Sequence, residues 1–180
     1  MESGVNPIFQ ARAVGSFAQK PGCPDYASEA LGAEDLARIC KDECYNPSDK
    51  RRLIARIDVI RIQPQSRDGE TVDALIEDPW RSFACDANPE GCVVTFSDPD
   101  YVPDGRDTLY YVRAVEESQP TINGAGVNCE YDEAGKCTSV SLCGRPGAPG
   151  SECLSEAGPK AWSSPIFLDR PRQGLATASN

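Results

Sequence analysis

The chain of 180 residues contains no histidine. This absence excludes, within the chain, Ser-His-Asp and Cys-His nucleophile activation, zinc sites with imidazole ligands and imidazole general-base chemistry. Catalysis would have to use carboxylates, lysine, tyrosine or cysteine, and no phosphate-binding glycine loop or Gly-x-Ser-x-Gly turn accompanies them. We therefore predict that the chain is not an enzyme and holds neither catalytic residues nor a cofactor.

Basic residues are also scarce, with 18 Lys and Arg against 28 Asp and Glu and a formal charge of −10. This balance argues against a nucleic-acid surface and against binding to an anionic membrane. No apolar run approaches the roughly 18–20 residues of a membrane helix. The first residues lack the features of a signal peptide, and on that ground alone we would expect a cytosolic protein.

Nine cysteines favour the opposite conclusion, because disulfides form in oxidising compartments. Eight of them have pair-like spacing, and Cys23 stands alone. The spaced cysteines are Cys40 and Cys44, Cys85 and Cys92, Cys129 and Cys137, and Cys143 and Cys153. We expect the last three of these pairs to be bonded and leave the connectivity of Cys23, Cys40 and Cys44 open. These cysteines predict a periplasmic or extracellular protein.

Two alternatives to a disulfide framework remain. A zinc ribbon is disfavoured because the sequence has no Cys-x-x-Cys pair. Reduced, buried cysteines would instead act as small apolar residues. An odd number of cysteines leaves one thiol free or bonded outside the chain.

Alternating apolar residues predict a mainly β fold. The segments Asp107–Glu117 and Ala161–Leu168 are candidate closing strands of an antiparallel β-sandwich of the fibronectin or immunoglobulin type. Leu53–Gln63 changes its polar parity, which favours a β-bulge near Val59 and Ile60 over a strand covered on both sides. Further strands are expected at 8–17 and 71–77 and one short helix at 31–40, with a turn at 45–49.

We expect a single domain over residues 1–180. Residues 5–122 and 161–169 would form the sandwich, 123–160 a Cys-rich insertion before the last strand, and 170–180 a disordered tail. Within the insertion, the segment from Cys129 to Cys137 resembles a hairpin. Trp80 is expected in the core, with a place in a ligand groove as the alternative.

The densest acidic cluster is a candidate calcium site, because calcium prefers flexible oxygen ligands. It consists of Asp98, Asp100, Asp104 and Asp107. Its spacing is not that of an EF-hand loop, and a solvated turn explains the same residues.

Several phrases of the sequence resemble the C-terminal part of an uncharacterised bacterial family, the domain of unknown function 3604 family. The phrases are Lys20–Cys23, Glu43–Asp49, Ile54–Ile62, Glu77–Trp80, Gly91–Cys92, Asp107–Ala114 and Ala161–Ile166. Full-length members of that family carry an upstream domain similar to the PHP (polymerase and histidinol phosphatase) metallohydrolases. The metal ligands of such a domain are His and carboxylates on the upstream barrel, so no residue of this chain takes their role.

The resemblance implies a non-catalytic accessory domain of an exported, metal-dependent hydrolase, with a phosphoesterase as the expected activity of the parent protein. The upstream hydrolase domain would then be the partner of this chain. The alternative is a self-standing extracellular binding module, with calcium as a candidate ligand. An enzyme in its own right is the third hypothesis and lacks an activated nucleophile or base.

Overall fold

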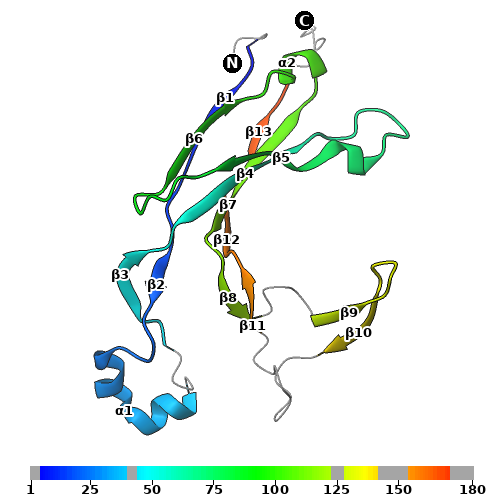
Figure 1. The fold of residues 1–180 in the computed structure, drawn as a ribbon. Helices are drawn as coiled ribbons and strands as arrows, with labels where there is room; N and C mark the ends of the chain where they lie inside the picture. Colours follow the sequence, from blue (N-terminus) through cyan, green and yellow to red (C-terminus); the bar gives the residue numbers. More distant parts are fainter. Residues whose placement is uncertain (1–4, 40–43, 123–127, 142–153, 171–180) are drawn as a thin grey trace, which may run out of the picture.

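A computed structural model describes residues 5–39, 44–122, 128–141 and 154–170 of the chain. Antiparallel β-strands dominate these ranges, which confirms the predicted fold class at this level. Figure 1 shows an elongated molecule whose largest sheet lies near the centre, with two thinner arms extending to one end. No helix in the described ranges is long and apolar enough to span a membrane.

The largest sheet has five antiparallel strands, with β4 and β7 at its centre. In chain order they are β4 (Ile54–Ile62), β5 (Ile76–Ala84), β7 (Thr108–Glu116), β12 (Lys160–Trp162) and β13 (Ile166–Leu168). β5 pairs with one edge of β4, whereas β12 and β13 both pair with the outer edge of β7. The two predicted closing strands are therefore neighbours, as expected from the sequence.

A two-stranded sheet of β1 (Ile8–Ala13) and β6 (Cys92–Ser97) packs against the five-stranded sheet. Along β1, the odd-numbered Phe9, Ala11 and Ala13 pack onto the large sheet, and the even-numbered residues are exposed. The ring centroids of Phe9 and Tyr110 lie 4.8 Å apart across the two layers. The core between the layers holds two clusters of buried residues. One consists of Val59, Phe96, Tyr110, Leu168 and Tyr101 of the short helix α2 (Tyr101–Asp104), and the other of Ile54, Ile57 and Cys92.

One side of this two-layer unit is closed by the connection from β5 to β6. A disulfide joins Cys85 to Cys92, with 5.8 Å between the Cα atoms, at the pair expected from the sequence. Next to it, Trp80 and Phe83 pack on Phe96, with ring centroids 6.4 Å and 5.9 Å away. Trp80 thus belongs to the core, as predicted, and links the edge strand β5 to the second layer.

The register irregularity predicted in β4 is present, but the extra residues lie on its partner. Val59 pairs with Arg81 and Arg61 pairs with Glu77, so two residues of β4 span four of β5. The prediction of a strand at 71–77 is wrong. Residues Val72–Leu75 form a 3-10 helix, and β5 begins only at Ile76 and continues through Pro79.

The region between β1 and β4 differs most from expectation. The helix α1 spans Asp25–Ile39 and begins six residues before the predicted start, with a break at Gly32, whose φ is 76°. Only Leu36 of α1 is buried, so no continuous apolar stripe marks its first half. A turn is predicted at 45–49, but most of this segment belongs to the strand β3 (Pro47–Arg51). β3 is extended because it pairs with β2 (Phe17–Gln19).

The second arm continues the β7 and β12 pair. β8 (Gln119–Ile122) pairs with β11 (Leu154–Ala157), and the hairpin of β9 (Asn128–Tyr131) and β10 (Cys137–Ser141) follows (Figure 1). The hairpin turn is held by Asp132 Oδ1, which accepts the N–H groups of Ala134 at 3.0 Å and Lys136 at 2.8 Å. The hairpin expected between residues 129 and 137 is confirmed. The tail predicted at 170–180 does not include Arg170, which bonds Asp107 and the carbonyls of Tyr101 and Val102, and residues 171–180 lie outside the described residues.

Candidate functional site

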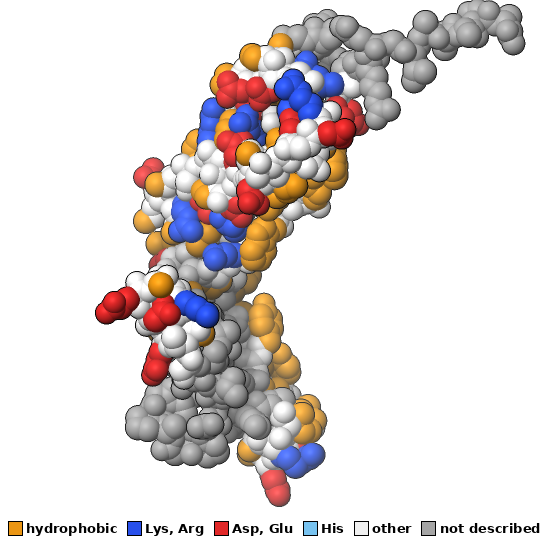
Figure 2. All heavy atoms as spheres, turned by 90° about the vertical axis from the view of Figure 1, so that its right-hand side faces the viewer, with side chains coloured by type: hydrophobic (Ala, Val, Ile, Leu, Met, Phe, Trp, Pro, Cys, Tyr) orange, Lys and Arg blue, Asp and Glu red, His pale blue; other side chains and the backbone are white. Residues whose placement is uncertain are grey.

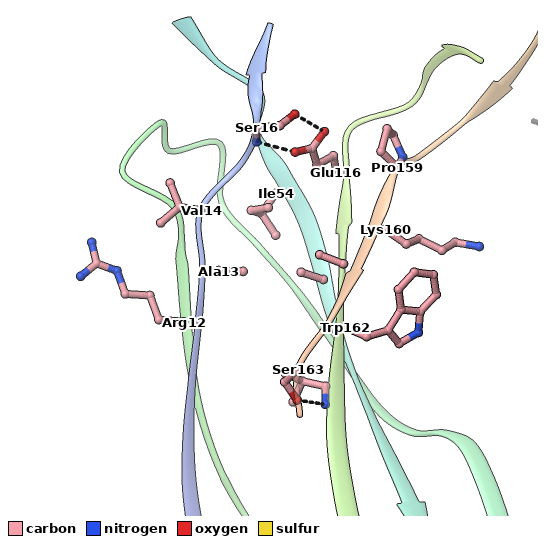
Figure 3. A pocket seen from close by; sticks show the side chains of 13 residues that line it. Arg12, Ala13, Val14, Ser16, Ile54, Glu116, Pro159, Lys160, Trp162 and Ser163 are labelled. Atoms are coloured by element: carbon pink, nitrogen blue, oxygen red, sulfur yellow. Dashed lines mark hydrogen bonds between the residues drawn. The ribbon is translucent and has the colours of Figure 1, made fainter. Parts of the chain in front are cut away.

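A groove lies between β1 and the β7–β12 edge, opposite the side closed by the disulfide (Figure 3). Its volume is about 390 Å³, and its floor is formed by the apolar side chains of Ile54, Val112 and Ala114. Consecutive residues of two segments form its walls, so the groove runs along backbone edges as well as side chains. These segments are 12–14 with 16 on one wall and 159–163 on the other.

A second cavity of about 260 Å³ extends the groove along the same two edges. Residues 9–12 of β1 line one wall, and Ser163, Ser164 and Ile166 line the other, with Tyr110 and Val112 from β7. Apolar side chains of this edge are exposed, including Trp162, Ile166 and Phe167. Figure 2 shows a stripe of hydrophobic side chains along one margin of the molecule.

The polar groups of the groove hold its walls together. Glu116 at the end of β7 accepts hydrogen bonds from the backbone N–H of Ser16 at 2.5 Å and from its hydroxyl at 3.1 Å. Ser163 accepts the N–H of Val112 at 3.1 Å and donates its own hydroxyl to the carbonyl of Ser164 at 2.9 Å. Both serine hydroxyls therefore have structural partners, a carboxylate for Ser16 and a backbone carbonyl for Ser163.

Two basic residues lie at the borders of the groove, Arg12 on β1 and Lys160 on β12. Neither forms an ion pair within the described residues. Figure 3 shows both side chains pointing away from the groove, on opposite outer faces. Both borders of the groove thus carry a positive charge, although the whole chain has a formal charge of −10.

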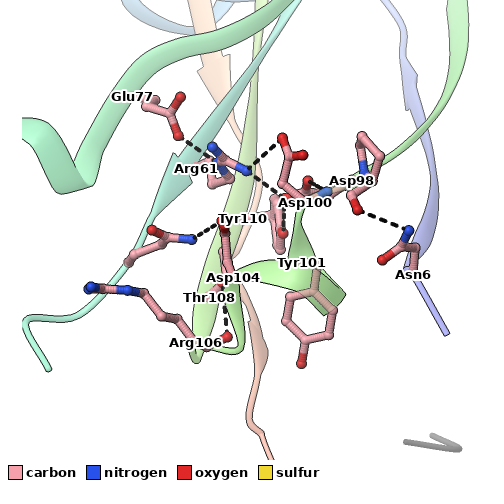
Figure 4. A network of polar contacts seen from close by, with 12 residues as sticks. Asn6, Arg61, Glu77, Asp98, Asp100, Tyr101, Asp104, Arg106, Thr108 and Tyr110 are labelled. Carbon is pink, nitrogen blue, oxygen red and sulfur yellow. Dashed lines mark hydrogen bonds and ion pairs between the residues drawn. The ribbon is translucent and has the colours of Figure 1, made fainter. Parts of the chain in front are cut away.

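A buried ion pair lies at the other end of the core (Figure 4). Asp98, 0 % exposed, accepts hydrogen bonds on Oδ2 from Arg61 Nη1 at 2.9 Å and from the Tyr110 hydroxyl at 2.6 Å. Its Oδ1 accepts the N–H of Asp100 at 2.9 Å. Arg61 in turn donates from Nε to Glu77 at 2.5 Å, so both charges of the pair are satisfied.

The electrostatics of this cluster fix its protonation state. Burial raises the pKa of Asp98, but the hydrogen bonds from Tyr110, Arg61 and Asp100 outweigh burial and hold that pKa below its usual range. Burial and the bond to Asp98 raise the pKa of Tyr110. A carboxylate, a phenol and a guanidinium therefore persist at neutral pH, and none of them titrates near neutrality as an acid or base catalyst would.

A second ion cluster covers the outer face of the large sheet. Asp58, 1 % exposed, accepts hydrogen bonds from Ser82 at 2.6 Å, Arg56 at 3.1 Å and Arg113 at 3.2 Å. Burial raises the pKa of Asp58, but the bonds from Ser82 and Arg113 and the charge of Arg56 lower it below its usual range. Arg113 also bonds Asp78 on β5, so this cluster joins three strands.

The four candidate calcium ligands have other partners in the structure, and Asp98 and Asp100 both lie near Arg61, with oxygens 2.9 Å and 4.0 Å from its Nη1. Asp98 is taken by Arg61, Asp104 accepts from Gln63 at 3.0 Å, and Asp107 accepts the N–H of Arg170 at 2.6 Å. The side chain of Asp100 is 60 % exposed. In the described part of the chain, no three His, Cys, Asp or Glu side chains lie close enough together to hold a metal ion.

The cysteines follow the sequence expectation in part. Cys44 is bonded to Cys23, with 4.8 Å between the Cα atoms, and is not paired with the nearby Cys40 as its spacing suggested. The pairing of β2 with β3 brings these two segments together, and Lys20 donates its N–H to Asn46 at 2.7 Å beside the disulfide. Cys137 is also disulfide-bonded. Cys40, Cys143 and Cys153 and the side chain of Cys129 lie outside the described residues.

The fold and the groove define a mainly β protein with an apolar cleft. No family model, curated protein or solved structure matches the chain. The resemblance to the C-terminal part of a PHP-like hydrolase family stays a prediction from the sequence.

Proposed function

We propose that the chain is a non-catalytic accessory domain of an exported, PHP-like, metal-dependent hydrolase. One observation carries this proposal. The buried ionisable side chains Asp58, Arg61 and Asp98 are all consumed in internal ion pairs, and the accessible groove offers apolar surface and strand edges. A site of this composition suits the binding of another polypeptide better than a chemical reaction.

The proposed fold is a fibronectin-like or immunoglobulin-like sandwich. The packing of the β1–β6 layer on the five-stranded sheet supports it, as do the alternating inward residues of β1 and β7. The disulfides Cys23–Cys44 and Cys85–Cys92 support export, because such bonds persist in oxidising compartments.

Two experiments test this function. Sequencing of the DNA upstream of the Met1 codon is expected to show an in-frame segment that encodes a His-containing hydrolase domain. Assays of the chain alone against generic phosphoesters with manganese, zinc or iron are expected to give background rates. Turnover that follows the protein through purification and is lost in Glu116→Gln, in the groove, would contradict the proposal.

The alternative function is a self-standing extracellular binding module, and the groove is the observation that favours it. Under this alternative the upstream DNA would contain no in-frame hydrolase segment, whereas the chain would still bind a ligand along β1. Calcium stays the candidate ligand that the sequence predicts for such a module, at Asp98, Asp100, Asp104 and Asp107.

A further inference from the structure

Two strand edges border the groove, that of β1 and that of β12 with β13, and both differ from the edge strand β5 on the opposite side. There, β5 contains Pro79, which has no N–H to donate, and charged residues at Glu77, Asp78 and Arg81. Such residues prevent another strand from adding to an edge. β1, with the sequence Ile-Phe-Gln-Ala-Arg-Ala, contains no proline and a single charge. Within the described residues, only β6 pairs with β1, so its second edge is free.

The facing edge, β12 with β13, is less suited to pairing. Its backbone pairing with β7 is interrupted between Trp162 and Ile166. In this interval the N–H of Val112 bonds the hydroxyl of Ser163 and no backbone carbonyl, and Pro165 has no N–H. The uninterrupted ladder of β1 covers six residues. β1 is therefore the edge of the groove that can accept a complete additional strand of about 20 Å.

We infer that the groove is the docking site for an extended strand of a partner polypeptide, which adds to the free edge of β1. Its alternate side chains would be apolar and enter the groove beside Phe9, Ala11 and Ala13, which face inward. This inference rests on the proposed function as a binding domain and specifies where and how the partner binds.

The charge of Arg12 indicates what kind of residue the outward face of the docked strand carries. An added strand places its outward side chains beside the outward row of β1, which is Ile8, Gln10 and Arg12. Arg12 has no ion pair among the described residues. Opposite charges on neighbouring strands attract, so the partner strand carries an acidic residue at the position beside Arg12.

A second copy of this chain does not meet that requirement through β1. Residues paired across two antiparallel strands project to the same face, so the outward row of one β1 would meet the outward row of the other. That row holds Ile8, Gln10 and Arg12 and no carboxylate, which would leave both arginines unpaired. A strand of different sequence, alternately apolar and polar with one acidic residue, fits the edge better.

The test uses the complete chain and synthetic eight-residue peptides of alternating valine and threonine. One threonine is replaced by glutamate in the first peptide and by lysine in the second, and a third peptide carries two prolines in place of valines. We expect the glutamate peptide to slow hydrogen exchange of alternate amides in residues 8–13. The lysine peptide should bind about two- to fivefold more weakly in calorimetry, and the proline peptide should not protect β1.

Arg12→Glu is expected to reverse the preference between the glutamate and lysine peptides. Arg67→Glu, an equal change of charge in an exposed loop, is the matched control and should leave the preference unchanged. The inference is overturned by absent protection of residues 8–13 at millimolar peptide, or by an unchanged preference in Arg12→Glu. It is also overturned if protection rises with protein concentration alone, which would show a second copy on this edge.

The outcome is separate from that of the proposed function. Phosphoester turnover by the chain would refute the accessory role and leave strand docking intact. Failure of every peptide to protect β1 would refute strand docking, whereas the hydrolase prediction would still be decided by the upstream DNA and the activity assays.

Discussion

The substitution Asp98→Asn tests whether the buried ion pair stabilises the two-layer core. The carboxylate accepts hydrogen bonds on both oxygens, from Arg61 and Tyr110 on one and from the Asp100 N–H on the other. An amide has one accepting oxygen and one donating nitrogen. In either orientation its NH₂ group faces a donor, so the substitution removes the charge and leaves at least one donor poorly paired.

The expected cost is about 3 kcal/mol, the order measured when one partner of a buried pair is removed. Arg61 keeps its 2.5 Å bond to Glu77, which holds the cost toward the lower end of that range. For a chain of this length, about 3 kcal/mol corresponds to a decrease in Tm of roughly 6–12 °C. Tyr110→Phe keeps the ring between Phe9 and Trp80 and removes one hydrogen bond, so we expect a smaller loss of about 1.5 kcal/mol.

The pH dependence of the stability difference distinguishes the loss of the Asp98 charge from other effects of the substitution. The pKa of Asp98 is depressed in the folded protein, so its stabilisation is present above the unfolded value of about 3.9 and is lost as the pH falls below it. Urea unfolding of the wild type and Asp98→Asn should therefore differ most at pH 7 and converge in acid. Asp68→Asn, in an exposed loop, is the control for a general charge effect. A loss below about 1 kcal/mol at pH 7, or equal losses at pH 7 and in acid, would refute the stabilising role of this pair.

Three further predictions concern the edges of the core. Replacement of both Cys85 and Cys92 by serine should cost about 2–3 kcal/mol in urea unfolding, because the bridge closes a loop with a sequence separation of 7; an equal stability of the oxidised protein and the variant would contradict this. Gly15→Ala should destabilise the protein by about 2 kcal/mol in thermal unfolding, because a Cβ atom there would lie 1.9 Å from the carbonyl oxygen of Arg52. Glu116→Gln should speed hydrogen exchange in residues 14–17 and lower the free energy of unfolding by about 1 kcal/mol, and unchanged exchange there would show that Glu116 does not tie the segment after β1 to β7.

Local patterns in the sequence identified the central strands and one covalent link. The alternation of Tyr110, Val112 and Ala114 marks the inward face of β7. The shift of polar parity in β4 marks a strand covered on both faces, since residues 57–61 are all buried and Arg61 bonds Asp98, whereas the extra residues of the irregular register lie on β5. The short separation of Cys85 and Cys92 made a closed loop the simplest pairing. These features could be predicted because their causes lie within a few neighbouring residues.

Features that depend on pairing between distant segments were missed. Cys23 bonds Cys44 only because β2 pairs with β3, and neither three-residue β2 nor polar β3 has a strand pattern of its own. Asp98 was grouped with its acidic neighbours, whereas its partner Arg61 lies 37 residues away. An arginine flanked by Val59, Ile60 and Ile62 was the available signal that a buried carboxylate would have to be found elsewhere.

The groove could not be predicted either, since its walls come from opposite ends of the chain. The sequence nevertheless holds a clue in the unequal protection of the sheet edges. β5 is blocked by Pro79 and tied to β6 next to it by a disulfide, whereas β1 combines apolar residues with the single charge of Arg12. An unblocked edge exposes a protein to unspecific strand pairing, so its persistence needs a compensating benefit. A partner strand that covers β1 and pairs with Arg12 supplies that benefit and removes the exposed edge at the same time.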